Sequence, residues 1–208
     1  MRVRIKLCGM MRREDIESAS RLGVDAVGLV FYAASPRHLR LEQARELAAS
    51  APAFLTVTAV FMNPARAQVE AVLQTVRVDV LQFHGEEPPE FCRAFGRGYI
   101  KAVPMGSGAD PAEYARRYAD ACGLLLDSHA QGKPGGAGTG FDWTRIPRIV
   151  SPPLILAGGL TADNVADAIR SVCPYGVDVA SGVESAPGIK DAVKMQAFVR
   201  EVNRVACA

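Results

Sequence analysis

Two side chains that can transfer protons stand immediately after short apolar segments of this chain. Cys8 follows Val3–Leu7, and Asp127 follows the run Gly123–Leu126. A thiolate is a base, and a carboxyl group with a raised pKa is an acid. We expect apolar neighbours to raise the pKa of Asp127 and backbone dipoles to lower that of Cys8. The pair therefore predicts acid–base catalysis.

Two glycine-containing segments suggest a phosphate site. Gly158 and Gly159 precede an expected helix start at Thr161–Asn164, and Ser181 and Gly182 follow another apolar run. Backbone N–H groups at helix starts attract anions, and glycine permits close approach. Tight turns would explain one such segment, but two on neighbouring strands favour phosphate binding.

Three further features have alternative explanations. Arg37 offers a planar fork for a carboxylate or phosphate, or is a solvated charge. His84 lines a site or is an ordinary barrel histidine. The run Gly135–Gly140 lies too far beyond its strand for a dinucleotide loop, so it is a mobile loop over the site or a disordered connection.

No metal site is expected from the sequence. His84 and Glu86 match the H-x-E of zinc deaminases, but the P-C-x-x-C partner is absent. The histidines at 38, 84 and 129 do not form a convincing ligand set. Five cysteines at wide spacings, without a C-x-x-C pair, argue against a disulfide network or a zinc site.

The elements that must position these residues alternate along the chain. Short apolar segments recur every 20 to 30 residues or so, as in repeated βα units. We expect strands at Val3–Leu7, Ala26–Val30, Leu55–Phe61, Val78–Phe83, Tyr99–Val103, Gly123–Leu126, Leu154–Ala157 and Val177–Ala180. Two helical stripes are expected to cover the sheet: Ala65, Val69, Val72 and Val76, and Ala192, Met195, Val199 and Val202.

Eight such units form a closed barrel or an open doubly wound sheet. The proposed base follows strand one, and the proposed phosphate donors follow strands seven and eight. Closure makes strands one and eight neighbours, whereas an open sheet need not. We therefore predict an α/β fold, a single-domain (β/α)8 TIM barrel spanning residues 1–208.

Composition limits the partners. The net charge is +2 over 208 residues, and no basic stripe with aromatics indicates nucleic acid binding. No apolar run approaches the roughly 20 residues that span a bilayer, and the N-terminus lacks the apolar region of a signal peptide. We expect a cytoplasmic protein that binds neither nucleic acid nor membrane, and that is a monomer or a homodimer.

The chain resembles the phosphoribosylanthranilate isomerases over essentially its whole length. The matching segments are Lys6–Met10, Ser35–Arg37, Gln82–Gly85, Leu126–Ser128, Gly135–Gly138, Phe141–Trp143, Ala157–Leu160, Asp178–Glu184 and Pro187–Asp191. Ala180, where the family usually has Ser, is a small departure beside the phosphate segment.

The resemblance implies an Amadori rearrangement of N-(5-phosphoribosyl)anthranilate to 1-(2-carboxyphenylamino)-1-deoxyribulose 5-phosphate in tryptophan biosynthesis. Cys8 would be the base and Asp127 the acid, and the iminium intermediate would serve as electron sink without a cofactor or metal. Arg37 would hold the anthranilate carboxylate. The other expected substrate-binding residues are His84, Gly138, Gly158, Gly159, Ser181 and Gly182.

Other functions on the same fold stay open. They are a metal-dependent epimerase, indole-glycerol-phosphate synthase, a bispecific isomerase that also takes the histidine-pathway substrate, and a phosphosugar sensor without chemistry. No catalytic lysine stands at a matching strand end for the synthase. Bispecific isomerases usually have aspartate at the position of Cys8, and the presence of both Cys8 and Asp127 argues against a sensor.

Overall fold

Eight parallel strands close into one barrel in the computed structural model, which describes residues 2–129, 142–143, 146–147 and 151–205. The strands are β1 Arg4–Cys8, β2 Ala26–Val30, β3 Thr56–Phe61, β4 Val80–Phe83, β5 Tyr99–Pro104, β6 Gly123–Asp127, β7 Leu154–Leu156 and β8 Gly176–Val179. Every predicted strand is present, with its ends shifted by one or two residues at most. The predicted (β/α)8 fold is confirmed.

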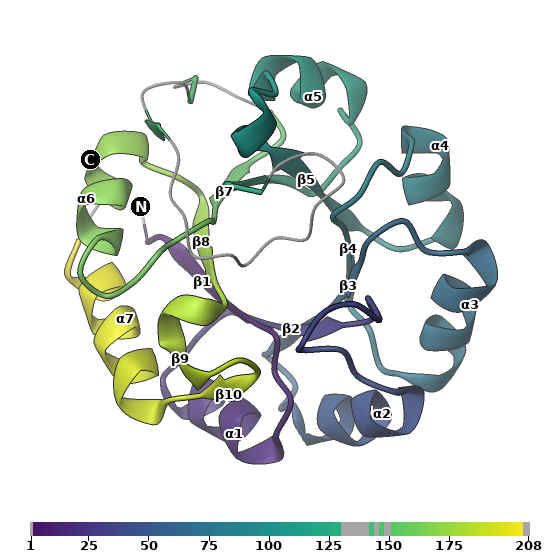
Figure 1. Cartoon of the computed structure of the whole chain (residues 1–208), viewed down its shortest axis with the longest axis horizontal. Coiled ribbons are helices and arrows are strands. Elements are labelled where there is room, and N and C mark those ends of the chain that lie inside the picture. The colour runs from purple at the N-terminus through teal and green to yellow at the C-terminus, as the bar shows by residue number, and fades with distance from the viewer. Residues whose placement is uncertain (1, 130–141, 144–145, 148–150, 206–208) are drawn as a thin grey trace.

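Helices surround the barrel and bury its outer surface (Figure 1). They are α1 Arg13–Arg21, α2 Leu41–Ser50, α3 Arg66–Thr75, α4 Pro89–Cys92, α5 Pro111–Arg117, α6 Val165–Val172 and α7 Ala192–Arg204. The apolar stripes of α3 and α7 are buried from Val69 and Met195 onward. Their first predicted members, Ala65 and Ala192, are exposed, because each stands at a helix start that extends beyond the core.

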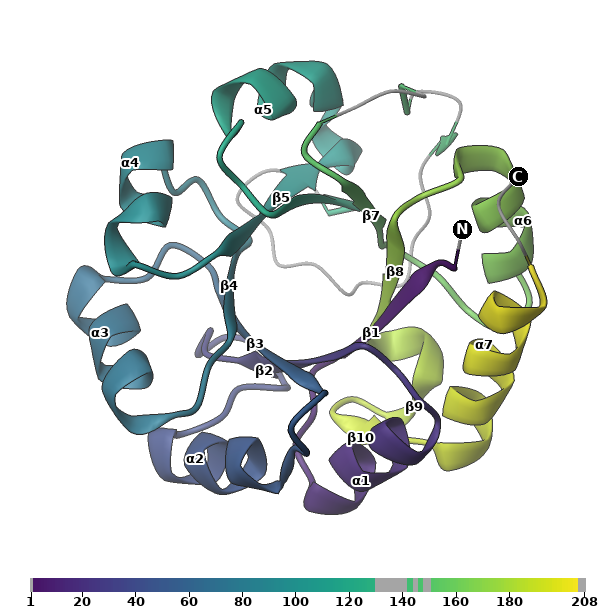
Figure 2. The same ribbon diagram turned by 180° about the vertical axis from the view of Figure 1, so that it is seen from behind.

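The barrel closes where β1 pairs with β8, in the register Lys6↔Asp178 and Leu7↔Val179. The Lys6 ammonium donates to the Asp178 carboxylate over 2.9 Å, and both side chains are buried. This closure, seen from both sides in Figures 1 and 2, makes the first and last strands neighbours as predicted.

A short hairpin after β8 was not predicted. It comprises β9 Glu184–Ala186 and β10 Ile189–Lys190, preceded by a 3-10 turn at Ser181–Val183. Two-residue and three-residue strands are too short to leave a periodic pattern in the sequence. The hairpin matters because it brings Glu184 and Lys190 to the site.

Three further points concern the cysteines, the helices and one glycine-rich run. The described cysteines, at 8, 92, 122 and 173, are all free thiols. Among the described residues, no helix is both long and apolar enough to cross a membrane. The run Gly135–Gly140, which includes the predicted binding residue Gly138, lies outside the described residues.

Candidate active site

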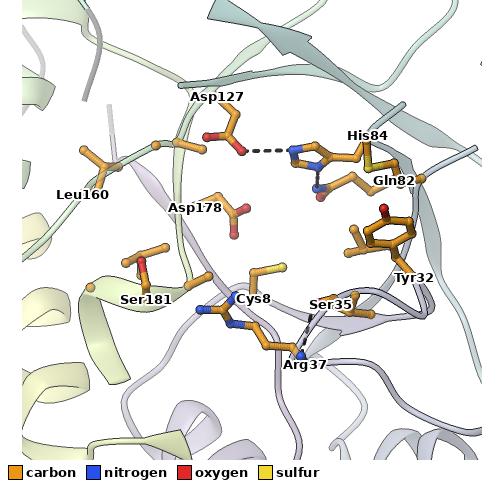
Figure 3. Close-up of a pocket in the computed structure, with 18 of the residues that line it drawn as sticks. Cys8, Tyr32, Ser35, Arg37, Gln82, His84, Asp127, Leu160, Asp178 and Ser181 are labelled. Carbon is orange, nitrogen blue, oxygen red and sulfur yellow. Dashed lines mark hydrogen bonds and ion pairs between the residues drawn. The ribbon is translucent and has the colours of Figure 1, made fainter. Parts of the chain in front are cut away.

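A pocket opens where the barrel strands end at their carboxyl termini. Its lining residues come from strand ends or from the loops that follow them, as Figure 3 shows. They include eight of the predicted site residues: Cys8, Arg37, His84, Asp127, Gly158, Gly159, Ser181 and Gly182. The structure thus brings together side chains that are more than 170 residues apart in the sequence.

Cys8 is the last residue of β1 and points into the pocket (Figure 3). A Cβ atom on Gly28 of the adjacent β2 would lie 2.7 Å from the Cys8 sulfur, so glycine leaves room for the thiol. Burial raises the pKa of the Cys8 thiol above its usual value, and the charges of Lys6 and Lys190 only partly oppose this. The expected lowering of this pKa is therefore wrong, because desolvation of the thiolate outweighs its neighbours.

Asp127 ends β6 and is held by a chain of polar side chains (Figure 3). His84 Nε2 lies 3.0 Å from Asp127 Oδ2, and Gln82 Nε2 lies 3.2 Å from His84 Nδ1. In this orientation of the Gln82 amide, its nitrogen donates to Nδ1, and the N–H at Nε2 of His84 donates a hydrogen bond to the carboxylate. His84 is thus a partner of the proposed acid as well as a lining residue.

A second histidine approaches the same carboxylate. His129 Nδ1 lies 3.4 Å from Asp127 Oδ2, without hydrogen-bond geometry, and the two imidazole rings are 4.5 Å apart. Burial raises the pKa of Asp127, but the interactions with His129 and His84 lower it by more, to below its usual value. The expected raised pKa is wrong, because the effect of burial is outweighed by His84, which the fold brings from 43 residues away, and by His129, two residues along the chain.

Arg37 is buried and already holds a carboxylate. Its Nε and Nη2 each donate to Glu184 over 2.7 Å, and Lys190 Nζ donates to Glu184 over 2.8 Å. One edge of the guanidinium is therefore fixed by the hairpin, and among the described residues nothing accepts from Nη1 or from the second Nη2 proton. Figure 3 shows the guanidinium directed toward the pocket near Cys8.

The two glycine segments lie on one side of the pocket. Gly158 and Gly159 have φ of +81° and +67°, which side chains with a Cβ rarely adopt. A Cβ on Gly182 would collide with the carbonyl oxygen of Leu160. Helix α6 begins after Asn164. In the loop before the helix, the Asn164 side chain accepts a hydrogen bond from the Thr161 N–H and donates one to the Gly159 carbonyl. The predicted segments thus form one wall beside a helix start.

Several functional neighbours escaped the sequence analysis. Glu184 accepts hydrogen bonds from both Arg37 and Lys190, and so holds Arg37 in place. Lys6 pairs with the pocket residue Asp178. His129 approaches Asp127. Lys6 and Asp178 did carry a signal, since a charge inside an apolar parallel strand needs a partner. His129 carried one too, because it stands two residues after Asp127 and side chains two apart on an extended chain point to the same side.

The comparisons place the chain in a known family. Residues 5–201 match the family model for N-(5'phosphoribosyl)anthranilate (PRA) isomerase. The chain is 52% identical over 205 residues to the N-(5'-phosphoribosyl)anthranilate isomerase of Nitrosococcus oceani, covering 99% of this chain and 100% of that protein.

Solved structures agree with this match. The phosphoribosyl anthranilate isomerase of Thermotoga maritima superimposes with a TM-score of 0.85 at 36% identity, covering 98% of this chain and 100% of that one. A second isomerase structure, with a TM-score of 0.82 at 35% identity and the same coverage, contains reduced 1-(o-carboxyphenylamino)-1-deoxyribulose 5-phosphate. The chain belongs to the N-(5'-phosphoribosyl)anthranilate isomerase family.

Proposed function

We propose that Cys8 and Asp127 are the base and acid with which this isomerase of tryptophan biosynthesis rearranges N-(5-phosphoribosyl)anthranilate. The observation that carries this assignment is their position in one pocket, on β1 and β6, facing the same space as the glycine wall and Arg37. The product is 1-(2-carboxyphenylamino)-1-deoxyribulose 5-phosphate.

Asp127 and Cys8 make the first two proton transfers of the reaction, and in the final tautomerisation C1 gains a proton while the C2 hydroxyl loses one. Asp127 gives its proton to the furanose ring oxygen, and the bond from this oxygen to C1 breaks as the nitrogen lone pair forms the iminium. Cys8 then removes the proton from C2, and these electrons neutralise the iminium to give an enolamine. Tautomerisation of the enolamine gives the ketone, so substrate and product are isomers and no electrons are gained or lost.

The pKa directions mean that the reactive form is a minor one. A lowered pKa keeps Asp127 ionised, and a raised pKa keeps Cys8 protonated, whereas the reaction begins with the opposite pair. The small population of this form is offset by its high reactivity. A carboxylic acid of low pKa is a strong proton donor, and a thiolate of high pKa is a strong base.

The pocket walls support a complete binding mode. The glycine wall, with Ser181, would take the phosphate on backbone N–H groups and a hydroxyl, next to the start of α6. The free donors of Arg37 would take the anthranilate carboxylate. Its other edge is held by Glu184, so the guanidinium is oriented before substrate arrives.

A turnover assay tests the proposal. Purified protein is supplied with phosphoribosylanthranilate made in situ, and loss of its fluorescence is coupled to detection of the rearranged product. We expect rapid turnover without added metal or cofactor. Binding of the substrate without conversion would instead support a sensor.

The assembly and location remain predictions. The Thermotoga maritima isomerase is described as dimeric, and we propose a monomer or a homodimer here, in the cytoplasm. Phe54, which is fully exposed, and Tyr175 line a cavity at the amino-terminal mouth of the barrel, and we propose that a homodimer would cover this apolar pair. Light scattering after size-exclusion chromatography, with Phe54→Ser beside the unchanged chain, distinguishes the two states.

A further inference from the structure

Three potential metal ligands converge on one point beside the pocket. Asp127 Oδ2 lies 3.0 Å from His84 Nε2 and 3.4 Å from His129 Nδ1. One ligand atom from each of the three residues lies within 4.8 Å of the other two. They come from the loop after β4 and from the end of β6, so only the closed barrel assembles them.

The two distances to Asp127 Oδ2 suit a tetrahedral metal ion. Bonds of about 2.0 to 2.2 Å at tetrahedral angles place neighbouring ligand atoms roughly 3.3 Å apart. The two distances to Asp127 Oδ2 lie on either side of that value. Two imidazoles and one carboxylate are also a donor set that Zn²⁺ and related divalent ions accept.

His129 is the observation that points to a missing ligand. Its side chain is only 2% exposed, and Nδ1, although 3.4 Å from Asp127 Oδ2, makes no well-formed hydrogen bond within the part of the chain that the structure describes. A buried polar nitrogen without a partner is costly, and a bound cation would satisfy it. The nitrogen lies on the side of His129 nearest Asp127, where the other two ligands converge.

Gln82 can orient His84 for metal binding. A histidine that binds metal through Nε2 carries its proton on Nδ1 and donates it to a neighbouring acceptor. Gln82 contacts His84 Nδ1 through its amide, and its Oε1 is buried without a partner. Rotation of this amide would present Oε1 to the Nδ1 proton of a metal-bound His84.

We propose that His84, Asp127 and His129 form a binding site for a divalent transition-metal ion, with Zn²⁺ as the best-matched ion, and that its occupation switches the isomerase off. Both His84 and Asp127 line the pocket, which leaves the fourth coordination position open to water or substrate. An ion bound to Asp127 Oδ2 would keep the carboxylate ionised, so Asp127 could not be protonated and could not act as the acid. The inhibition rests on the proposed role of Asp127, whereas the binding does not.

Metal binding is measured first, on the full chain after treatment with a chelator. Calorimetric titration with Zn²⁺ alone should give one ion per chain. Co²⁺ should give the visible bands of a tetrahedral site. Because thiols elsewhere in the chain also bind these ions, the titration uses a Cys122→Ser, Cys173→Ser, Cys207→Ser background. A spectrum dominated by thiolate charge transfer would overturn the assignment of ligands.

The variants identify the ligands. His129→Ala should weaken Zn²⁺ binding by at least about tenfold, the scale on which changes around metal sites act. His38→Ala removes the third histidine, which lies outside the pocket lining, and should leave affinity unchanged. If His129→Ala fails to fold, His84→Gln is tested for binding alone. Equal affinity in the tested ligand variant and His38→Ala, or no binding by the chain, would overturn the site.

Turnover separates this inference from the proposed function. Zn²⁺ should inhibit the parent chain reversibly, and His129→Ala should turn over substrate with at least about tenfold lower sensitivity to Zn²⁺. Binding without inhibition would contradict both the switch and the role of Asp127 as acid. A chain that binds Zn²⁺ at these ligands but never converts substrate would contradict the proposed function and leave the site standing.

Discussion

At the scale of single residues, Cys8 is the first assignment to test. Cys8→Ala should lower kcat by about 10² to 10⁴, the usual contribution of a positioned base, because no other described thiol lines the pocket. Steady-state kinetics with Cys122→Ala as the matched control, an exposed thiol elsewhere, measures the effect. Near-normal turnover by Cys8→Ala would end the assignment.

Arg37 should contribute to binding as well as to orientation. Arg37→Ala should lower kcat/KM by an amount equivalent to about 2 to 5 kcal/mol, because the anthranilate carboxylate loses a charged partner and Glu184 keeps only Lys190. Arg37→Lys restores the positive charge without the planar pair of guanidinium donors, so it should recover only part of the lost kcat/KM. An unchanged kcat/KM for Arg37→Ala would contradict this role.

The pH dependence follows from the two shifted groups. The acid must be protonated and the base ionised, while the pKa of Asp127 is lowered and that of Cys8 is raised. The fraction with both groups correct is then small and nearly constant between the two pKa values. This fraction decreases at pH values below the pKa of Asp127, because less of Cys8 is ionised there. It also decreases at pH values above the pKa of Cys8, because less of Asp127 is protonated there.

We therefore expect a broad plateau of kcat/KM across neutral pH, in place of a narrow bell. The profile measured in buffers of constant ionic strength tests this. Removing the His84 hydrogen bond with His84→Gln should raise the pKa of Asp127 and move the acidic limb to higher pH. A limb that does not move would show that His84 does not set this pKa.

At the scale of elements, we expect the turn after β8 to bind phosphate and the start of β8 to contribute only to packing. A Cβ on Gly182, in the turn after the strand, would meet the Leu160 carbonyl in the glycine wall, whereas one on Gly176 at the other end would lie 3.2 Å from the Arg4 carbonyl oxygen. Gly182→Ala should raise KM and weaken binding of inorganic phosphate. Gly176→Ala should lower the thermal midpoint slightly and leave KM unchanged.

A comparison of both variants by phosphate binding and thermal unfolding decides the point. If Gly182→Ala loses only stability, the turn is a packing feature and the phosphate lies elsewhere. If Gly176→Ala also weakens phosphate binding, the effect is spread through β8 and does not belong to the turn.

At the scale of the whole molecule, the seam of the barrel depends on a buried ion pair. Lys6→Met leaves the Asp178 carboxylate buried and unpaired between β1 and β8. Loss of one partner of such a pair costs about 3 to 5 kcal/mol of unfolding free energy. Denaturant unfolding should show this loss. Arg4→Ala, on the same strand but in an exposed pair with Asp25, should change stability little.

The sequence alone determined the architecture of the molecule. Alternating apolar segments and helical stripes are local patterns, so they predicted all eight strands and the closed barrel. Polar residues after those strands predicted the edge that carries the pocket. Eight of the nine proposed site residues line it, and the ninth, Gly138, lies outside the described residues.

Only the tertiary structure decided the electrostatics of the pocket. The pKa of Asp127 depends in part on His84, which lies 43 residues away in the chain, and the orientation of Arg37 depends on Glu184, which lies 147 residues away. Such contacts leave no periodic trace, because they join loops through space and act over a few ångströms. A local pattern shows which side chains reach the pocket, but the balance between desolvation and neighbouring charges exists only once the barrel has closed.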